Sequence, residues 1–380
     1  LEPGQVISLK GRPVRLEGTP ASALRSTTNR VDYLLITHPV LEDQVRRLAD
    51  FRVAQQPALQ TRVVLMDDIY DEFSYGIETP EAIQRFLAHA YAHWQQRPEY
   101  VLFGGGGSFD YKNYLGYADN LVTCLRVDTP YGLFSSDNAL ADVVGNDGEP
   151  EFSIGRIPSS TLDSMSNVVS KIIARETNAF RTNLVLLAAD NPDEAGDFGA
   201  TASGMTNRFP PAYSFTNLVL TANEANVAQA RNAFRASFNS GLALMLYFGH
   251  ASWNRLSTSG LWRLDDMSTF SNFPRLPIVF TMACWPNRFE FPGYVYIGEG
   301  FVLTPSHGAV AAWGPSGESL NVFAQTYTEY LLDAFKADPA LRLGTLARLA
   351  AQRANTAGLP RFMRDGMTLL GDPMTPIDIP

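Results

Sequence analysis

Two residues whose side chains can carry out nucleophilic chemistry each follow an apolar run. The run LALMLYF (242–248) leads through Gly249 into His250, and the run LPIVFTMA (276–283) leads directly into Cys284. A thiolate is a strong nucleophile, and a nearby imidazole can take the thiol proton and later give it to a leaving amine. If the two runs are neighbouring parallel strands, both side chains lie at the same edge of a sheet. The pattern therefore predicts acyl transfer through a thioester.

Both residues also have a structural interpretation. Cysteine is among the most frequently buried residues, so a cysteine after an apolar strand is usually part of a core. A histidine at a strand end is equally ambiguous when it is taken alone. The chain has one other cysteine, Cys124, which leaves room for at most one disulfide and argues against a disulfide-stapled scaffold. Spacing alone leaves the catalytic and the structural interpretations open.

Other motifs fit known chemistries less well. Four glycines at 104–107 could cradle a phosphate, but no Gly-Lys-Ser/Thr follows them, and a tight turn is favoured. The segment GPSGE (314–318) differs from a serine-hydrolase elbow at its fifth position. His89 and His93 could share a helix face, but no third metal ligand accompanies them. No metal site is predicted from these residues.

The elements that must position His250 and Cys284 alternate in type along the chain. Short apolar runs typical of buried strands occur at 31–37, 61–66, 99–103, 183–189, 242–248, 276–283 and 308–313. Helical patterns lie between them, at about 80–94, 162–179, 222–239, 320–336 and 338–355. Apolar strands that alternate with helices are typical of a parallel sheet covered on both faces. The predicted fold class is therefore α/β.

Composition limits the possible partners. The chain has 380 residues, a formal net charge of −9 and a pI near 5.1, which argues against a nucleic-acid partner. No apolar run approaches the length needed to cross a membrane, and the first residues lack a hydrophobic signal core. Residues 1–30 are rich in Gly, Pro, Ser and Thr and are predicted to form an N-terminal arm or linker.

Several segments, in a fixed order, resemble the gingipain family of cysteine peptidases, which belongs to the caspase-like clan. The resemblance is carried by YFGHASW (247–253), FTMACWPNRFE (280–290) and LLGDPMTPI (369–377), and upstream by blocks within 31–161, so that it covers about 31–377. The segment GSFDYKN (107–113) is similar to the sortase-type members that process cargo of the type IX secretion system.

The resemblance implies a caspase-like three-layer α/β/α fold with mainly parallel sheets in two side-by-side subdomains. These would be an N-terminal subdomain at 31–165 and a catalytic subdomain at 166–380. It also implies that Cys284 and His250 form the catalytic dyad and that Glu151 orients the histidine. The backbone N–H groups of Ala251 and Cys284 are expected to bind the oxyanion.

The chain departs from the family at the positions that bear on substrate binding. Ala251 stands where the family usually has glycine, and Gly106 where relatives often carry aspartate. The resemblance implies substrate contacts from Asp163, after the Gly-Arg block, and from the segment that begins at Trp313 and includes Ser316. Within this loop (WGPSGESL, 313–320), Trp313 is the first residue, and the tryptophan that the family carries in its pocket wall is missing.

The expected function is cleavage of peptide bonds in protein or peptide substrates, outside the cell, as in most of the family. Two alternatives stay open: a sortase-like transpeptidase, and a caspase-like scaffold without activity. Flanking domains of a larger precursor are further expected partners. No cofactor is expected to be required; calcium is an optional ligand in the family, and acidic loops such as 190–197 could accept it, although no EF-hand spacing occurs.

Overall fold

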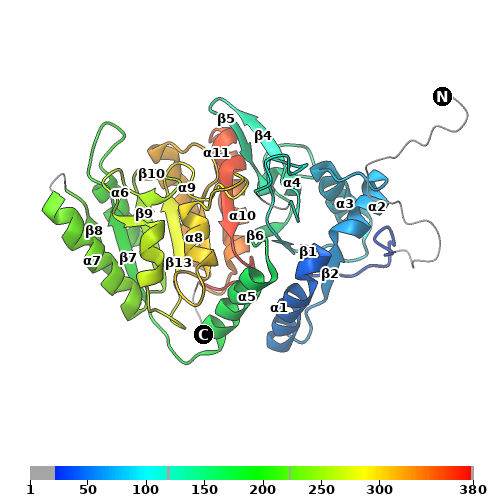
Figure 1. The fold of residues 1–380 in the computed structure, drawn as a ribbon, viewed down its shortest axis with the longest axis horizontal. Helices are drawn as coiled ribbons and strands as arrows, with labels where there is room; N and C mark the ends of the chain where they lie inside the picture. The colour runs from blue at the N-terminus through cyan, green and yellow to red at the C-terminus, as the bar shows by residue number, and fades with distance from the viewer. Residues whose placement is uncertain (1–21, 118–119, 222–223, 378–380) are drawn as a thin grey trace, which may run out of the picture.

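The computed structural model describes residues 22–117, 120–221 and 224–377, and a single ten-stranded sheet runs through the molecule (Figure 1). The strands, in their order across the sheet, are β2 (Thr61–Leu65), β1 (Tyr33–Thr37), β3 (Tyr100–Gly104), β6 (Ser153–Ile157), β15 (Met367–Leu370), β14 (Ala311–Pro315), β13 (Ile278–Met282), β9 (Leu244–Phe248), β7 (Leu184–Ala189) and β8 (Ser214–Val219).

Most strand pairs in this sheet are parallel. β2, β1, β3 and β6 pair in parallel on one side, and β14, β13, β9, β7 and β8 do so on the other. β15 joins the two groups: it is antiparallel to β14 and meets β6 in a single bridge between Leu370 and Arg156. The predicted α/β class with a mainly parallel sheet is confirmed.

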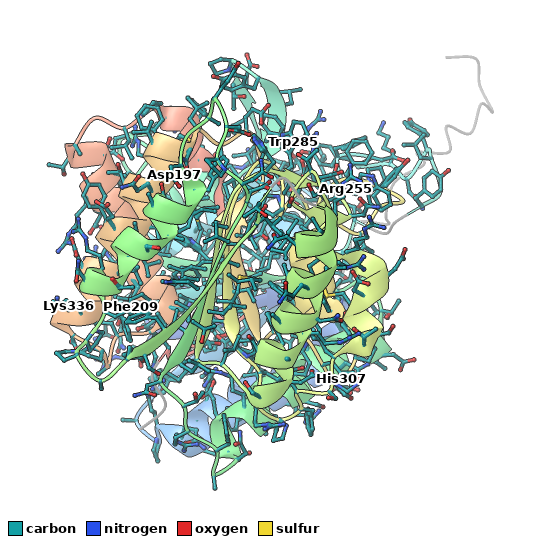
Figure 2. The ribbon with its side chains drawn as sticks, turned by 90° about the vertical axis from the view of Figure 1, so that its left-hand side faces the viewer. Asp197, Phe209, Arg255, Trp285, His307 and Lys336 are labelled. Atoms are coloured by element: carbon teal, nitrogen blue, oxygen red, sulfur yellow. The ribbon has the colours of Figure 1, made fainter. Side chains whose placement is uncertain are left out.

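Helices cover both faces of the sheet, as its buried strands require (Figures 1 and 2). One layer contains α7 (Glu224–Ser240) and α8 (Ile297–Leu303), together with α1 (Glu42–Gln55) and α5 (Leu162–Thr177), which pack against each other. The opposite layer contains α6 (Phe198–Gly204), α9 (Asn321–Ala337) and α10 (Leu343–Thr356). The remaining helices are α2 (Met66–Ser74), α3 (Pro80–His93), α4 (Asp137–Ala141) and α11 (Arg361–Gly366).

Side-chain alternation in β1 shows why this apolar strand must be covered by helices on both faces of the sheet. Tyr33 and Leu35 join the core cluster that includes α1, whereas Leu34 and Ile36 join the cluster that includes α3. Successive side chains of a strand point to opposite faces, so a strand that is apolar throughout can be buried only between two layers.

Several elements escaped the sequence analysis because they are short or lie at an edge. β6 (SIGRI) contains Gly155 and Arg156, which interrupt its apolar run, β15 is only four residues long, and β8 is an edge strand whose side chains are mostly exposed. A hairpin of β4 (Arg126–Thr129) and β5 (Gly132–Ser135) and a small sheet of β10 (Ala251–Ser252), β11 (Arg255–Leu256) and β12 (Trp262–Arg263) also went unpredicted. Short runs carry too few residues for a periodic signal.

The predicted N-terminal arm lies only partly within the described residues, since 1–21 fall outside them. Its described end packs onto the fold: Leu24 is buried and its carbonyl accepts a hydrogen bond from Trp94 Nε1. Strands from 31–165 and from 166–380 join one sheet, so the sheet itself does not separate two subdomains. The division at these residues stays a prediction. No helix in the described ranges is long and apolar enough to cross a membrane.

A buried polar network fixes the segment after β15. The Asp372 carboxylate accepts a hydrogen bond from Tyr33 Oη at 2.8 Å and bonds to Arg52 Nε and Nη2 at 2.8 and 2.6 Å. Arg52 also pairs with Glu176 at the end of α5. The network therefore ties the C-terminal segment to β1, α1 and α5, and Asp372 has a structural role.

We expect Asp372→Ala to lower the free energy of unfolding by about 3 kcal/mol, because it leaves the Arg52 guanidinium buried with half of its partners. Urea denaturation followed by circular dichroism measures this. Asp163→Ala is the matched control, since Asp163 is exposed and should change stability by less than about 0.5 kcal/mol. Equal stability of the two variants would contradict the assigned role of Asp372.

Candidate active site

The strands β9 and β13 bring His250 and Cys284 to one edge of the sheet. They pair in parallel up to Phe248 and Met282, and the N–H of Gly249 donates to Met282 O at 3.3 Å. His250 lies two residues after Phe248, and Cys284 lies two residues after Met282. Figure 2 shows Arg255 and Trp285, from the segments that follow β9 and β13, toward one end of the sheet, whereas His307 and Lys336 lie toward the other.

A carboxylate from the neighbouring strand's loop holds the His250 ring. His250 Nε2 lies 2.8 Å from Oδ2 of Asp193, which belongs to the segment after β7. A proton shared with this carboxylate resides on Nε2, which leaves Nδ1 free to accept a proton. Although burial acts in the opposite direction, hydrogen bonds from the Ala195 N–H and from His250 lower the pKa of Asp193. Asp193 is therefore suited to orient the ring.

A second aspartate holds the His250 backbone. Asp190 is buried, accepts a hydrogen bond from Ser257 Oγ at 2.9 Å and lies 3.4 Å from the His250 N–H. The Tyr247 hydroxyl donates to His250 O at 2.7 Å. Gly249 has φ +155°, and a Cβ there would lie 2.5 Å from the Cβ of Asp190, so only glycine fits. These contacts define the conformation of the turn that presents His250.

The Cys284 thiol is covered by the loop that follows β14. Its Sγ donates to Ser319 O at 3.4 Å, and the side chain of Glu318 also contacts it. Burial, followed by the contact with Glu318, raises the pKa of the Cys284 thiol to about 12. Within the described part of the chain, the thiol bonds to this loop and the His250 ring to Asp193, so the two side chains do not bond to each other. The thiol is held in its protonated form.

The backbone after Cys284 is strained and tightly anchored. Trp285 has φ +63°, a left-handed conformation that is uncommon for a bulky residue and is often found at functional sites. Its N–H donates to Gly317 O at 3.0 Å. The buried Asn287 side chain donates to the carbonyls of Ala312, Gly314 and Thr368. These bonds fix the turn that presents the thiol.

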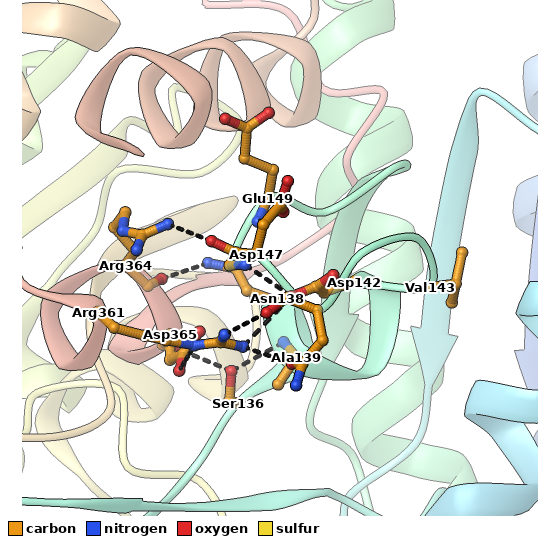
Figure 3. Close-up of polar contacts among 12 residues, drawn as sticks. Ser136, Asn138, Ala139, Asp142, Val143, Asp147, Glu149, Arg361, Arg364 and Asp365 are labelled. Carbon is orange, nitrogen blue, oxygen red and sulfur yellow. Dashed lines mark hydrogen bonds and ion pairs between the residues drawn. The ribbon is translucent and has the colours of Figure 1, made fainter. Parts of the chain in front are cut away.

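The structure corrects the expectation that Glu151 orients His250. Glu151 precedes β6, which lies four strands from β9, roughly 19 Å away at the usual strand spacing. Its carboxylate accepts hydrogen bonds from the N–H groups of Val143 and Val144. Figure 3 shows Val143 beside the polar cluster that joins α4 to α11, in which Ser136 and Asn138 bond to that helix. Glu151 therefore helps to order the segment after α4.

The predicted substrate contacts also lie elsewhere. Asp163 is exposed in the first turn of α5, directly after β6. Trp313 is 1% exposed and packs against Phe280 and Tyr327 in the core. Ser316 is fully buried, and its hydroxyl bonds to Ser135 O. The structure brings none of the three to His250 or Cys284, although Glu318 and Ser319, just beyond Ser316, do reach the thiol.

Sequence reasoning missed Asp190 and Asp193, the two carboxylates that contact His250. Both follow the strand predicted at 183–189, and in a parallel sheet the segment after each strand converges on one edge. The strand order, which places β7 next to β9, was the missing information.

Three carboxylates of the acidic loop at 190–197 make separate contacts within the protein. Asp190 bonds to Ser257, Asp193 to His250, and Asp197 caps α6 through the Ala200 N–H. The described ranges contain no group of three or more His, Cys, Asp or Glu side chains placed to hold a metal ion. These three carboxylates are thus engaged in separate contacts, and calcium binding at this loop stays a prediction.

Comparisons with known proteins identify sequences related to this chain. The sequence profile of Peptidase family C25 matches residues 26–378. Gingipain R2 and Gingipain R1 of Porphyromonas gingivalis are each 23% identical over 266 residues, which cover 68% of this chain and only 32% and 24% of theirs. The chain thus spans about a third or less of these relatives.

A solved structure extends the comparison to the fold. The crystal structure of the Arg-specific cysteine proteinase gingipain R superposes with a TM-score of 0.73, at 20% identity, over 96% of this chain and 81% of the other. At this level of identity the superposition shows a shared gingipain-type, caspase-like fold. Together with the match over 26–378, it leads to one conclusion: the chain belongs to Peptidase family C25, the family of the gingipain cysteine peptidases.

Proposed function

We propose that the chain is a cysteine endopeptidase that uses Cys284 as nucleophile and His250 as general base and acid. The observation that supports this most is the parallel pairing of β9 with β13, which ends two residues before each of these side chains. Proteins of this family are cysteine peptidases, and the residue pair matches that chemistry.

The reaction would proceed in two acyl-transfer steps. Nδ1 of His250 takes the thiol proton, and Sγ of Cys284 attacks the carbonyl carbon of the scissile bond. The N–H groups of Ala251 and Cys284 stabilise the oxyanion of the tetrahedral intermediate. The imidazolium then protonates the leaving amine as the C–N bond breaks, and water hydrolyses the thioester with His250 again as base. Asp193 acts as a positioning residue throughout.

The closed loop over the thiol adds a requirement for activity. Ser319 accepts the hydrogen bond of the Cys284 thiol, and Glu318 lies beside it. A thiol with a raised pKa is a poor nucleophile at neutral pH. We therefore propose that the segment at 318–320 shifts when substrate binds, so that the thiol is released toward His250.

Cys284→Ala is expected to abolish turnover of a fluorescein-labelled casein substrate while leaving the far-UV circular dichroism spectrum unchanged. His250→Ala should lower kcat by at least about a hundredfold, the scale of general acid–base catalysis. Product analysis by mass spectrometry, with and without an added amine, separates hydrolysis from transpeptidation. Residual turnover in the Cys284→Ala variant would remove the assignment, and an inactive wild type would favour the scaffold alternative.

Asp193→Asn should lower kcat/KM by roughly tenfold, with the loss mainly in kcat, because the ring loses the acceptor that fixes its tautomer. The effect is modest because the pair is partly exposed, with 44% of the His250 side chain accessible. Asp193→Glu should restore part of the loss. Asp197→Asn, in the same loop, should retain full activity, since asparagine also caps helices well. Equal effects of both asparagine variants would contradict a positioning role for Asp193.

Glu318→Gln should increase the rate of iodoacetamide labelling at Cys284. The thiolate is the reactive form, and removing a negative charge beside the thiol lowers its raised pKa and increases the thiolate fraction at neutral pH. In the wild type the labelling rate should keep rising with pH through 9, since the pKa is about 12. Peptide mass spectrometry measures the adduct, and the fully buried Cys124 serves as the unreactive control. An unchanged rate would show that Glu318 does not restrain the thiol.

A further inference from the structure

A cavity that has no part in the proposed reaction lies beside the segment that follows Cys284. Its volume is about 400 Å³, and it opens where the segments after β3 and β6 meet the segment that follows Cys284. Glycines at 106, 107 and 293 line it, together with the hydroxyl groups of Ser108 and Ser160. A Cβ at Gly106 would lie 2.7 Å from Ser160 Oγ, so the glycine keeps this space open.

Two buried carboxylates line this cavity. Glu290 is 1% exposed, accepts a hydrogen bond from Ser135 Oγ at 2.8 Å and forms an ion pair with Arg288 Nε at 3.2 Å. Glu299 is 5% exposed and uses one oxygen, Oε2, to accept a hydrogen bond from the Tyr296 N–H at 2.8 Å. In the part of the chain that the structure describes, Glu299 forms no ion pair. Burial raises the pKa of Glu299 to about 8, so this carboxyl group is largely protonated at neutral pH when no cation lies beside it.

Aromatic rings form the walls beside these carboxylates. Phe291 and Tyr294 line the cavity and contact each other, and Phe109 packs on Phe291. A buried carboxylate within aromatic walls is suited to a long cationic side chain, whose methylene groups contact the rings while its charged end meets the acid. A free metal ion fits less well, because no third carboxylate or imidazole among the described residues completes a ligand set there.

The cavity is linked to the strand edge that carries the nucleophile. The Tyr294 ring packs edge-on against Trp253, three residues after His250, with centroids 5.1 Å apart. β6 and β3 lie three and four strands from β13, or roughly 14 to 19 Å. An extended peptide advances about 3.3 Å per residue, so a chain held at Cys284 reaches the cavity within about four to six residues.

We infer that this cavity is a substrate subsite that binds a lysine or arginine side chain located about four to six residues from the scissile bond, with Glu299 as its counter-charge. The inference rests on the proposed peptidase function. A site roughly 14 to 19 Å from β13 is too far away to hold the residue at the scissile bond itself. The subsite selects for a basic residue in the flanking sequence of a protein substrate.

Peptide binding to the Cys284→Ala variant tests the subsite without requiring turnover. The probes are fluorescein-labelled dodecapeptides of alanine and serine that carry one lysine, moved through every position, and matched peptides with the neutral isostere norleucine. Fluorescence anisotropy gives Kd for each pair. Glu299→Gln keeps an oxygen for the Tyr296 N–H and removes the charge, and Glu78→Gln, an exposed change of the same charge, is the matched control.

We expect lysine to bind about tenfold more tightly than norleucine within a window of adjacent positions. This preference should fall to less than twofold with Glu299→Gln and persist with Glu78→Gln. If Glu299→Gln does not fold, Tyr294→Ala, at a half-exposed wall residue, should weaken the same lysine peptides about threefold. No lysine preference, or one that survives both Glu299→Gln and Tyr294→Ala, would overturn the subsite. If the wild type shows no turnover but still prefers lysine over norleucine in a way that depends on Glu299, only the peptidase function is overturned.

Discussion

The pairing of β9 with β13 is the constraint on which the candidate site depends. Because the strands run in parallel and end level, the residues that follow them emerge at one edge, and His250 and Cys284 are placed there by backbone hydrogen bonds. β7 completes the arrangement on the other side of β9 and delivers Asp190 and Asp193. One aspartate fixes the histidine backbone and the other its ring, so position and tautomer are set by separate groups.

The Cys284 thiol is held by a hydrogen bond to the loop after β14, whereas the His250 ring is already oriented by Asp193. Ser319 and Glu318 belong to the segment after β14, the neighbour of β13, and the same segment anchors the Trp285 backbone through Gly317. A shift of this segment would therefore change the thiol contacts and the turn behind it together. A substrate that binds the shifted arrangement of this segment more tightly than the arrangement seen here would favour the shifted one. Substrate binding could in this way control when the Cys284 thiol becomes reactive.

The proposed flanking subsite uses the same edge of the sheet at a greater distance. Glu299 is buried and has no cationic partner among the described residues, and its pKa of about 8, raised by burial, leaves it largely protonated at neutral pH in the absence of a cation. The aligned segment covers only 32% and 24% of the gingipains named above, so most of their length lies outside the alignment. A subsite formed entirely within the caspase-like fold, from the segments after β3, β6 and β13, does not depend on those additional parts.

The sequence by itself determined the alternation of strands and helices, the α/β class and the two strand ends that carry His250 and Cys284. These signals are local: apolar runs of strand length, helical periodicity and the residue that follows each run. It could not determine which strands are neighbours. Glu151 and Asp163 therefore seemed suitable from the resemblance to the family, yet they belong to the region of β6, four strands from β9. Asp193 and Glu318 were instead brought to the site by β7 and β14, because strand order results from long-range packing that no local pattern records.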